Sequence, residues 1–385
     1  MRHFEFLSPP EAETLFAVPP VAFDRAADRE TVADALGATL YSPATRPRLV
    51  DDLVRSRARG VVSSVVCLED SIRDADVESA LTHLVTVLSA FAGRADEAPL
   101  VFVRVRSPEQ IDHITRELGD SADALVGFVL PKFAEDSGGD YLRAVECASE
   151  RLSRRLWAMP VIETPEVMYA ESRSEALGGI ARVLRHHRDH VLAVRTGATD
   201  LAAVYGLRRP RELTVYDVRV VAAVLTAVVN MLGRPGDEGF VVTGPVWEYY
   251  SDSERLFKPQ LRETPFLGRD DRALRAQLIS EELDGLIREV VLDRANGLVG
   301  KTVIHPSHVP VVHALSVVSH EDHSDAVAVL GADAGGAFRS EYGNKMNETN
   351  PHRAWAERTV RRARAFGVAA PGVSFVDLLA AVDRG

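Results

Sequence analysis

The sequence predicts a (β/α)8 barrel, a closed ring of eight parallel strands surrounded by helices, followed by a C-terminal helical extension. Three observations support this fold: apolar runs of strand length recur, segments with helical periodicity separate them, and charged residues follow the runs at their carboxyl ends. Strands that alternate with helices imply right-handed crossovers and a parallel sheet buried on both faces. Eight such units over about 270 residues suit the barrel.

The eight predicted strands are rich in β-branched residues and bounded by turn residues. They span residues 38–43, 61–70, 99–105, 127–132, 155–164, 191–200, 239–245 and 300–306. Between them, segments such as 107–119 carry apolar residues three and four apart, as amphipathic helices do. Ser107, Pro108 and Glu109 form a helix start, with a hydroxyl cap, proline at the first position and an acid in the first turn.

A doubly wound open sheet is the alternative, but no G-x-G-x-x-G follows an early strand, so its usual phosphate loop is missing. We therefore divide the chain into an N-terminal extension (1–37), a barrel domain (38–310) and a C-terminal helical lid segment (311–385).

Charge and composition narrow the class of partner. A net charge of -11 argues against nucleic acid and anionic membranes, which would need a basic face. Cys67 and Cys147 are the only cysteines and give neither a disulfide framework nor a zinc spacing. The N-terminus has no apolar run of signal-peptide length, and the longest apolar stretch, 220–229, is too short to span a bilayer. We expect a cytoplasmic protein that acts on small molecules.

Lysine is rare among the basic residues, most of which are arginine. The simplest explanation is codon bias, yet an ammonium and a guanidinium are not interchangeable. The lysines are Lys132, Lys258, Lys301 and Lys345.

Polar residues stand where six of the predicted strands end, which is where a barrel builds its active site. Buried without partners, such groups would cost several kcal/mol each. They are Glu69 and Asp70, Arg104, Lys132, Glu163, Asp200 and His305.

Two of these acids, Glu163 and Asp200, follow neighbouring strands, so their carboxylates can share a proton or a cation. Oxygen ligands alone favour Mg2+ or Mn2+ over zinc. Arg104 offers a planar fork suited to a substrate carboxylate. The rim therefore predicts a metal site for an oxo- or hydroxy-acid, with an enolate charge developing next to the cation.

A succession of short motifs over roughly residues 38–325 resembles the citrate lyase β-subunit branch of the HpcH/HpaI aldolase superfamily. It is closest to the lyase-like branch associated with tellurite-resistance and stress operons. The motifs are LYSPATRP (40–47), VCLEDSIRDAD (66–76), VFVRV (101–105), GFVLPK (127–132), VIETPEVM (161–168), GATDLAAVYG (197–206) and GLVGKTVIHPSHV (297–309). The resemblance implies a TIM barrel and a magnesium-dependent carbon-carbon lyase that acts next to a carboxylate or thioester; whether coenzyme A takes part stays open.

The resemblance also implies roles for individual residues. Glu163 and Asp200 match the metal ligands, and Arg104 matches the arginine that holds a keto acid. Glu69 and Asp70 match the pair that orders the metal's water shell. We add to the substrate-binding set Arg46, Lys132, Gly197, Ala198 and Thr199.

Related lyases carry a C-terminal lid that reaches over a neighbouring subunit's barrel, which implies a homo-oligomer, trimer or larger. Glu348, in Met346-Asn347-Glu348, matches the catalytic acid of that lid, with glutamate for the usual aspartate. His305 is either a structural histidine or a proton carrier.

The sequence departs from the family in two further places. Arg106 replaces a frequent asparagine, so a charge would face the substrate in place of an amide donor. The segment 244–266 is longer and more aromatic than usual and carries Lys258.

Two histidine-rich clusters are assigned to helix ends and not to metal sites. In 319–325, Ser319 followed by acids suits a helix N-terminus, and in 185–190 the histidines suit a helix C-terminus.

Three functions fit these residues. The first is a Mg2+-dependent carbon-carbon lyase. The alternatives are another metal-dependent enzyme that works on an enol or phosphoenol, and a barrel without catalysis that serves as a binding subunit in a stress-response complex.

Overall fold

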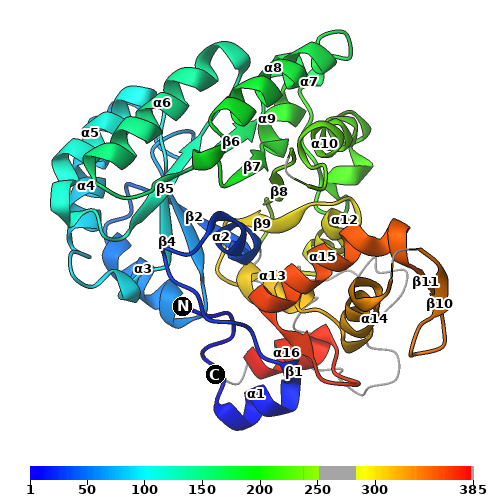
Figure 1. Ribbon diagram of the computed structural model, residues 1–385. Coiled ribbons are helices and arrows are strands. Elements are labelled where there is room, and N and C mark those ends of the chain that lie inside the picture. Colours follow the sequence, from blue (N-terminus) through cyan, green and yellow to red (C-terminus); the bar gives the residue numbers. More distant parts are fainter. Residues whose placement is uncertain (237, 251–282, 334, 383–385) are drawn as a thin grey trace.

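The computed structural model describes residues 1–236, 238–250, 283–333 and 335–382 and contains a closed eight-stranded barrel (Figure 1). Each strand pairs in parallel with its neighbours in the sequence, and the first also pairs with the last, which closes the ring. The prediction of a (β/α)8 barrel is confirmed. The strands are β2 Ala38–Pro43, β3 Ser63–Cys67, β4 Leu100–Arg104, β5 Leu125–Leu130, β6 Trp157–Ile162, β7 Ala193–Thr196, β8 Val241–Trp247 and β9 Val299–Val303.

The outer layer consists of helices whose apolar faces cover the barrel. In α5, Ser107 is the extended N-cap residue and Pro108 begins the helix, as predicted, but the Ser107 hydroxyl makes none of the predicted capping hydrogen bonds to the backbone. Its buried residues Ile111, Ile114 and Leu118 recur three and four apart and pack against the strands. The helices of this layer are α3 Leu49–Ala58, α4 Val77–Ser89, α5 Pro108–Leu118, α6 Glu135–Arg151, α7 Pro165–Met168, α8 Arg173–His186, α9 Ala198–Ala203, α10 Arg219–Leu232, α12 Leu283–Ala295 and α13 His308–Ser316.

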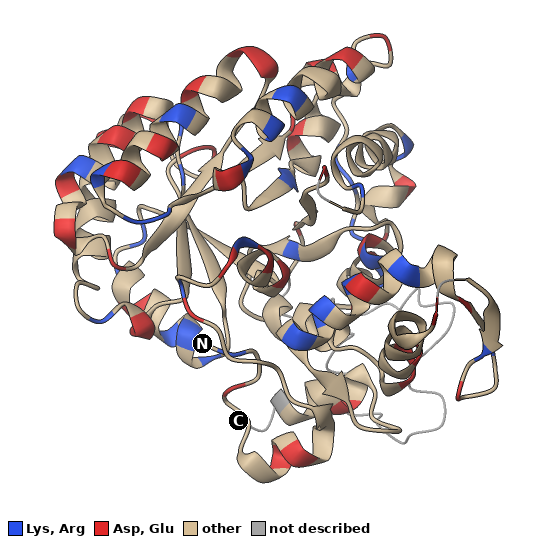
Figure 2. Ribbon diagram, in the orientation of Figure 1, with Lys and Arg blue, Asp and Glu red and all other residues tan. Residues whose placement is uncertain are grey.

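Short 3-10 helices occur in the connections, at Asp74–Asp76, Ala95–Glu97, Gly119–Ser121, Arg188–His190 and Val215–Asp217. Figure 2 shows that the charged residues lie mainly on the outer helices and that the strands carry few of them. None of the helices in the described ranges is both long and apolar enough to cross a membrane.

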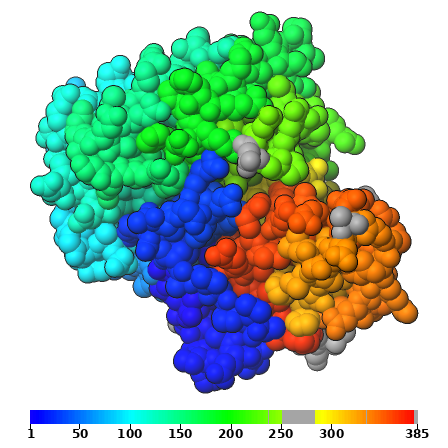
Figure 3. Space-filling model, viewed as in Figure 1, coloured from blue at the N-terminus to red at the C-terminus, as the bar shows by residue number. Residues whose placement is uncertain are grey.

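The two ends of the chain pack together beside the barrel. The N-terminal elements are α1 Pro9–Leu15, β1 Phe16–Val18 and α2 Arg29–Ala35, and the C-terminal ones are α14 His320–Gly331, β10 Ala337–Arg339, β11 Met346–Glu348, α15 Thr349–Phe366, β12 Val368–Ala369 and α16 Phe375–Val382. β1 pairs antiparallel with β12, and α15 packs against α2. In Figure 3 the blue N-terminal segment accordingly lies against the red and orange C-terminal segment. Because α2 leads directly into β2, this assembly lies at the amino-terminal end of the barrel.

A buried ion network ties the last strand to its preceding helix. The Lys301 ammonium on β9 lies 2.9 Å from Glu289 and 2.7 Å from Asp293, both on α12. Arg209 also pairs with Glu289, and the Tyr216 hydroxyl donates to Asp293 at 2.8 Å. The Lys301 side chain is fully buried, so its charge is stable only because two carboxylates surround it.

Replacing Lys301 with Met should therefore destabilise the protein by about 3–5 kcal/mol, because two buried carboxylates would lose their shared cation. Chemical denaturation followed by circular dichroism measures this. The matched control is Arg73→Ala, which breaks a 2.7 Å pair with Asp76 at a side chain that is 85% exposed and should leave the stability nearly unchanged, because solvent screens the pair. Equal losses in the two variants would contradict the argument.

Candidate active site

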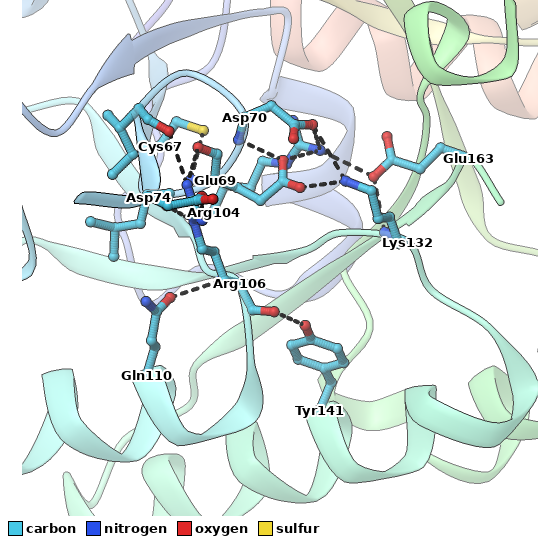
Figure 4. Close-up of polar contacts among 12 residues, drawn as sticks. Cys67, Glu69, Asp70, Asp74, Arg104, Arg106, Gln110, Lys132, Tyr141 and Glu163 are labelled. Atoms are coloured by element: carbon cyan, nitrogen blue, oxygen red, sulfur yellow. Dashed lines mark hydrogen bonds and ion pairs between the residues drawn. The ribbon is translucent and has the colours of Figure 1, made fainter. Parts of the chain in front are cut away.

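Charged side chains from four neighbouring strands meet at the carboxyl end of the barrel (Figure 4). Glu69 and Asp70 follow β3, Arg104 is the last residue of β4, Lys132 follows β5 and Glu163 follows β6. Parallel strands deliver their ends to one rim, so residues far apart in the sequence become neighbours here.

Arg104 is the centre of this cluster. Its Nη2 lies 2.7 Å from Glu69 Oε2, 3.1 Å from Glu163 Oε1 and 3.5 Å from Asp70 Oδ2. Burial disfavours its charge, but the negative charges of Glu163 and Glu69 keep the pKa of Arg104 above its ordinary value. The guanidinium is thus a permanent cation shared by three carboxylates.

Glu163 is the most deeply buried acid of the cluster, with a side chain that is 1% exposed. Its Oε1 accepts hydrogen bonds from Arg104 and, at 2.9 Å, from the backbone N–H of Lys132. Burial raises the pKa of Glu163 to about 7; the charge of Arg104 opposes the increase, and that of Asp200 adds to it. The second oxygen, Oε2, accepts no hydrogen bond from any described residue.

Gly197 provides the space that Oε2 occupies. A Cβ atom at this position would lie 2.0 Å from Glu163 Oε2, so no larger residue fits without moving the carboxylate. Gly197 precedes α9, and Asp200 stands in the first turn of that helix. Ala198 is buried between them, and Thr199 is exposed and donates to Glu248 at 2.8 Å. Oε2 of Glu163 therefore lies against Gly197, directly before the helical turn that carries Asp200.

Lys132 supplies the second cation. Its backbone has φ = 47°, which is uncommon for a residue with a side chain and places strain at this rim. Its ammonium pairs with Glu69 and lies 3.4 Å from Asp70. Burial and the hydrogen bond with Asp70 raise the pKa of Glu69, whereas the hydrogen bond with Glu69 and the charge of Lys132 lower that of the more exposed Asp70.

Three predicted site residues lie outside this cluster. The Arg46 guanidinium is half exposed and pairs with Asp52 at 2.7 Å. His305 is at the same end of the barrel, after β9; its Nδ1 lies 2.8 Å from Ser307 Oγ, and its ring stacks on Tyr250. Glu348 ends β11, far along the chain from the rim, and its backbone N–H donates to His352. A role for Glu348 on a neighbouring barrel stays a prediction.

Arg106 does not present its charge to the rim. Its guanidinium donates to the carbonyls of Leu68 at 2.7 Å, Glu69 at 3.2 Å and Ile72 at 2.9 Å, and pairs with Asp74. These contacts brace the loop that holds Glu69 and Asp70, which the sequence alone did not indicate. A guanidinium has five N–H donors, so one Arg106 side chain can serve several loop carbonyls at once.

Sequence reasoning also missed a buried arginine inside the barrel and its contact with an aromatic ring. Arg195 on β7 is 2% exposed, and its guanidinium lies 5.4 Å from the ring centre of Tyr41 on β2. Burial raises the pKa of Tyr41. Because both faces of a barrel strand are buried, the sequence does not show which residues point inward. The one available signal was the arginine itself, which directly follows the apolar run VLAV.

The two discounted histidine clusters lie at helix ends. The Ser319 hydroxyl accepts from the Asp322 N–H at the start of α14, which confirms the predicted cap. His187, at the end of α8, lies 2.6 Å from Glu146. The predicted rim segment 244–266 falls largely outside the described residues, as does Lys258.

Within the described part of the chain, no group of three or more histidine, cysteine, aspartate or glutamate side chains is arranged to hold a metal. The rim instead offers a pair of acids, Glu163 and Asp200. A cation held by two protein carboxylates keeps its other positions for water and substrate, which is the usual state of Mg2+ and not of structural zinc.

Comparison with known proteins identifies the family and the fold. The model of the family described as C-C bond lyase of the TIM-barrel fold matches residues 30–368. A citrate lyase from Burkholderia xenovorans aligns with a TM-score of 0.61 at 14% identity, covering 90% of this chain and 96% of that one. CitE from Mycobacterium tuberculosis, solved with magnesium, acetoacetate and coenzyme A, aligns with a TM-score of 0.52 at 21% identity, covering 86% and 99%. No curated protein sequence matches the chain significantly.

Glu163 should make stability fall as pH rises in the metal-free protein. Its folded pKa of about 7 exceeds the unfolded value of 4.5, so the folded state keeps a proton that the unfolded state loses. As the pH rises from the lower to the higher of these values, the free energy of unfolding of the wild type should fall by about 3 kcal/mol relative to that of Glu163→Gln. Urea denaturation at a series of pH values in EDTA measures the difference. Glu166→Gln, at an exposed position of α7, is the control for lost charge, and a pH-independent difference for Glu163→Gln would refute the assignment.

Proposed function

The chain belongs to the family of carbon-carbon bond lyases of the TIM-barrel fold, and from this premise we propose that it is a Mg2+-dependent lyase. It cleaves or forms a carbon-carbon bond in a small oxo- or hydroxy-carboxylic acid, or in its thioester, through an enolate. Membership of the family supports the carbon-carbon lyase activity. The residues at the rim of the barrel support the choice of metal and of a carboxylic acid as the substrate.

The observation that carries the proposal is the free oxygen of Glu163. A carboxylate with a 1% exposed side chain has one oxygen bound by Arg104 and Lys132, while the other lies against Gly197, directly before the helical turn that carries Asp200. Two acids whose charges disfavour each other are stabilised by a cation between them. The donor set consists of oxygen atoms only, so Mg2+ or Mn2+ fits it, with Glu163 and Asp200 as the protein ligands.

When bound, the ion supplies Lewis-acid polarisation of a substrate oxygen, the chemistry that favours an enolate. CitE from Mycobacterium tuberculosis was crystallised with magnesium and a keto acid, which supports the same class for this chain. The fold similarity places no individual residue of this site.

The chain's own residues then hold the acid and limit its movement. Arg104 presents a planar fork that binds a carboxylate in two places, and Lys132 beside it adds a point charge. Glu69 and Asp70 orient both cations, and Arg106 fixes the loop that carries these two acids. Gly197, Ala198 and Thr199 form the adjoining wall of the substrate site.

Metal binding should depend on both acids of the pair. Glu163→Gln and Asp200→Asn each remove one anionic metal ligand and keep the size of the side chain. We therefore expect each variant to lose measurable Mg2+ binding and to keep the circular dichroism spectrum of the wild type. Gly197→Ala should weaken binding as well, because the methyl group displaces Glu163 Oε2. Calorimetric titration with Mg2+ measures all three. Glu166→Gln should bind as wild type does, and wild-type affinity in Glu163→Gln or Asp200→Asn would remove that residue from the site.

Arg104→Lys should keep the charge and lose the bidentate fork. Affinity for oxaloacetate in the presence of Mg2+ should fall by about 1.5–3 kcal/mol, the worth of a charge-assisted hydrogen bond. The same titration of Arg73→Lys, an exposed position outside the rim, should match wild type. An unchanged oxaloacetate affinity in Arg104→Lys would show that the substrate carboxylate binds elsewhere.

A further inference from the structure

A large cavity lies at the opposite end of the barrel from the candidate active site. It has a volume of about 810 Å3 and is bounded by residues where three strands begin: 191–192 before β7, 241–242 on β8 and 298–300 on β9. Its other wall is formed by α2, α12 and α15. A volume of this size suits a small organic ligand and exceeds what one inorganic ion needs.

Arginine dominates the charged lining. Seven arginines and five acids line the cavity in a chain that carries a net charge of -11. The arginines come from separate segments, among them Arg29 on α2, Arg294 on α12, and Arg358 and Arg362 on α15. Figure 2 shows basic residues recurring along α15, where this helix lies next to α2. In Figure 3, which has the same view, the orange C-terminal segment borders the barrel.

Most of the acids in the lining already form an ion pair with a basic residue. Four of the five have such a partner: Asp34 with Arg361 at 3.1 Å, Asp293 with Lys301 at 2.7 Å, Asp322 with Lys345 at 3.5 Å and Glu357 with Arg353 at 3.5 Å. Three of these partners, Lys301, Lys345 and Arg353, are not part of the cavity lining. The acids therefore do little to neutralise the remaining arginines.

Four guanidiniums, those of Arg29, Arg294, Arg358 and Arg362, have no carboxylate within ion-pair distance among the residues that the structure describes. Arg29 donates to the Arg188 carbonyl at 3.4 Å, Arg294 to that of Leu315 at 2.9 Å and Arg358 to that of Gly297 at 2.8 Å. The Nε atom of Arg362 is buried and has no hydrogen-bond partner. Each guanidinium has five N–H donors, so most of these donors remain available.

The arginines also repel one another. Burial, together with the positive charges of Arg294 and Arg358, lowers the pKa of Arg362 to about 10. A multiply charged anion would reverse this effect, because each guanidinium would gain an opposite charge and a charge-assisted hydrogen bond.

An aromatic ring stands beside these charges. Trp355, Arg358 and Arg362 are three and seven residues apart on α15, so they share one face of the helix. Trp355 lines the cavity and is 38% exposed, whereas the other tryptophans, Trp157 and Trp247, are at most 2% exposed. An exposed indole next to unneutralised guanidiniums can stack on a planar base while the arginines bind phosphates.

We propose that this cavity binds a small phosphate-bearing anion of the nucleoside diphosphate class, at a site separate from the lyase site. Trp355 stacks on the base, and Arg294, Arg358 and Arg362 hold the phosphates. The proposal is independent of the proposed substrate, because the two sites lie at opposite ends of the barrel and share no residue.

The test is calorimetric titration of the full-length protein with ADP in EDTA, so that no metal at the rim can hold the phosphates. Wild type should bind, with quenching of tryptophan fluorescence that is lost in Trp355→Phe. Arg358→Gln and Arg362→Gln should each weaken binding by about tenfold or more, the factor expected for a lost charge-assisted hydrogen bond. Arg294→Gln, on a different helix, gives a second measurement if an α15 variant does not fold.

Two matched controls separate this site from general charge and from the rim. Arg364→Gln removes an exposed arginine of α15 that does not line the cavity, and Arg104→Gln removes the central cation of the rim. Both should bind ADP as wild type does. Absence of ADP binding at millimolar concentration, equal weakening in Arg364→Gln, or loss of binding in Arg104→Gln would each overturn the proposal.

Discussion

The ion pair between Arg104 and Glu163 is the interaction on which the candidate site depends. A carboxylate as buried as Glu163 could not stay in place next to other acids without a cation, because burial and like charges both oppose its ionisation. Arg104 is the last residue of β4, whereas Glu163 follows β6, and the Arg104 guanidinium also contacts Glu69 and Asp70. One guanidinium thus fixes three acids, and it leaves the second oxygen of Glu163 against Gly197, directly before the helical turn that carries Asp200.

The rare lysines follow the same principle of one cation shared by several acids. Lys132 contacts Glu69 and Asp70, Lys301 contacts Glu289 and Asp293, and Lys345 contacts Glu321, Asp322 and Asp325. Lys258 lies outside the described residues. An ammonium is compact and has three donors that can point in different directions, so it can pair with several carboxylates at once, as the guanidinium of Arg104 also does. At each of the three described positions, the lysine is therefore a cation shared by two or more acids.

The fold and the order of the rim residues could be predicted from sequence because both depend on local pattern. Each strand is a short apolar run, and a charge at its end, such as Arg104 or Glu163, marks the rim whatever the rest of the chain does. Contacts that depend on loop conformation could not be predicted: Arg106 braces a neighbouring loop, and Arg46 pairs with Asp52. The buried partners of Lys301 were equally hidden, since α12 alone does not show which of its acids faces β9.

The two ends of the barrel treat positive charge differently, and stability alone does not account for the difference. At the carboxyl end the Arg104 guanidinium is surrounded by acids. At the amino-terminal end four arginines donate to carbonyls or to no described group, in a chain with 56 acids and 45 basic residues. A carboxylate beside each of these guanidiniums would lower their mutual repulsion. Arginines without carboxylate partners around an exposed indole instead suit an anion-binding surface, since a carboxylate of the protein would compete with the ligand for the same donors.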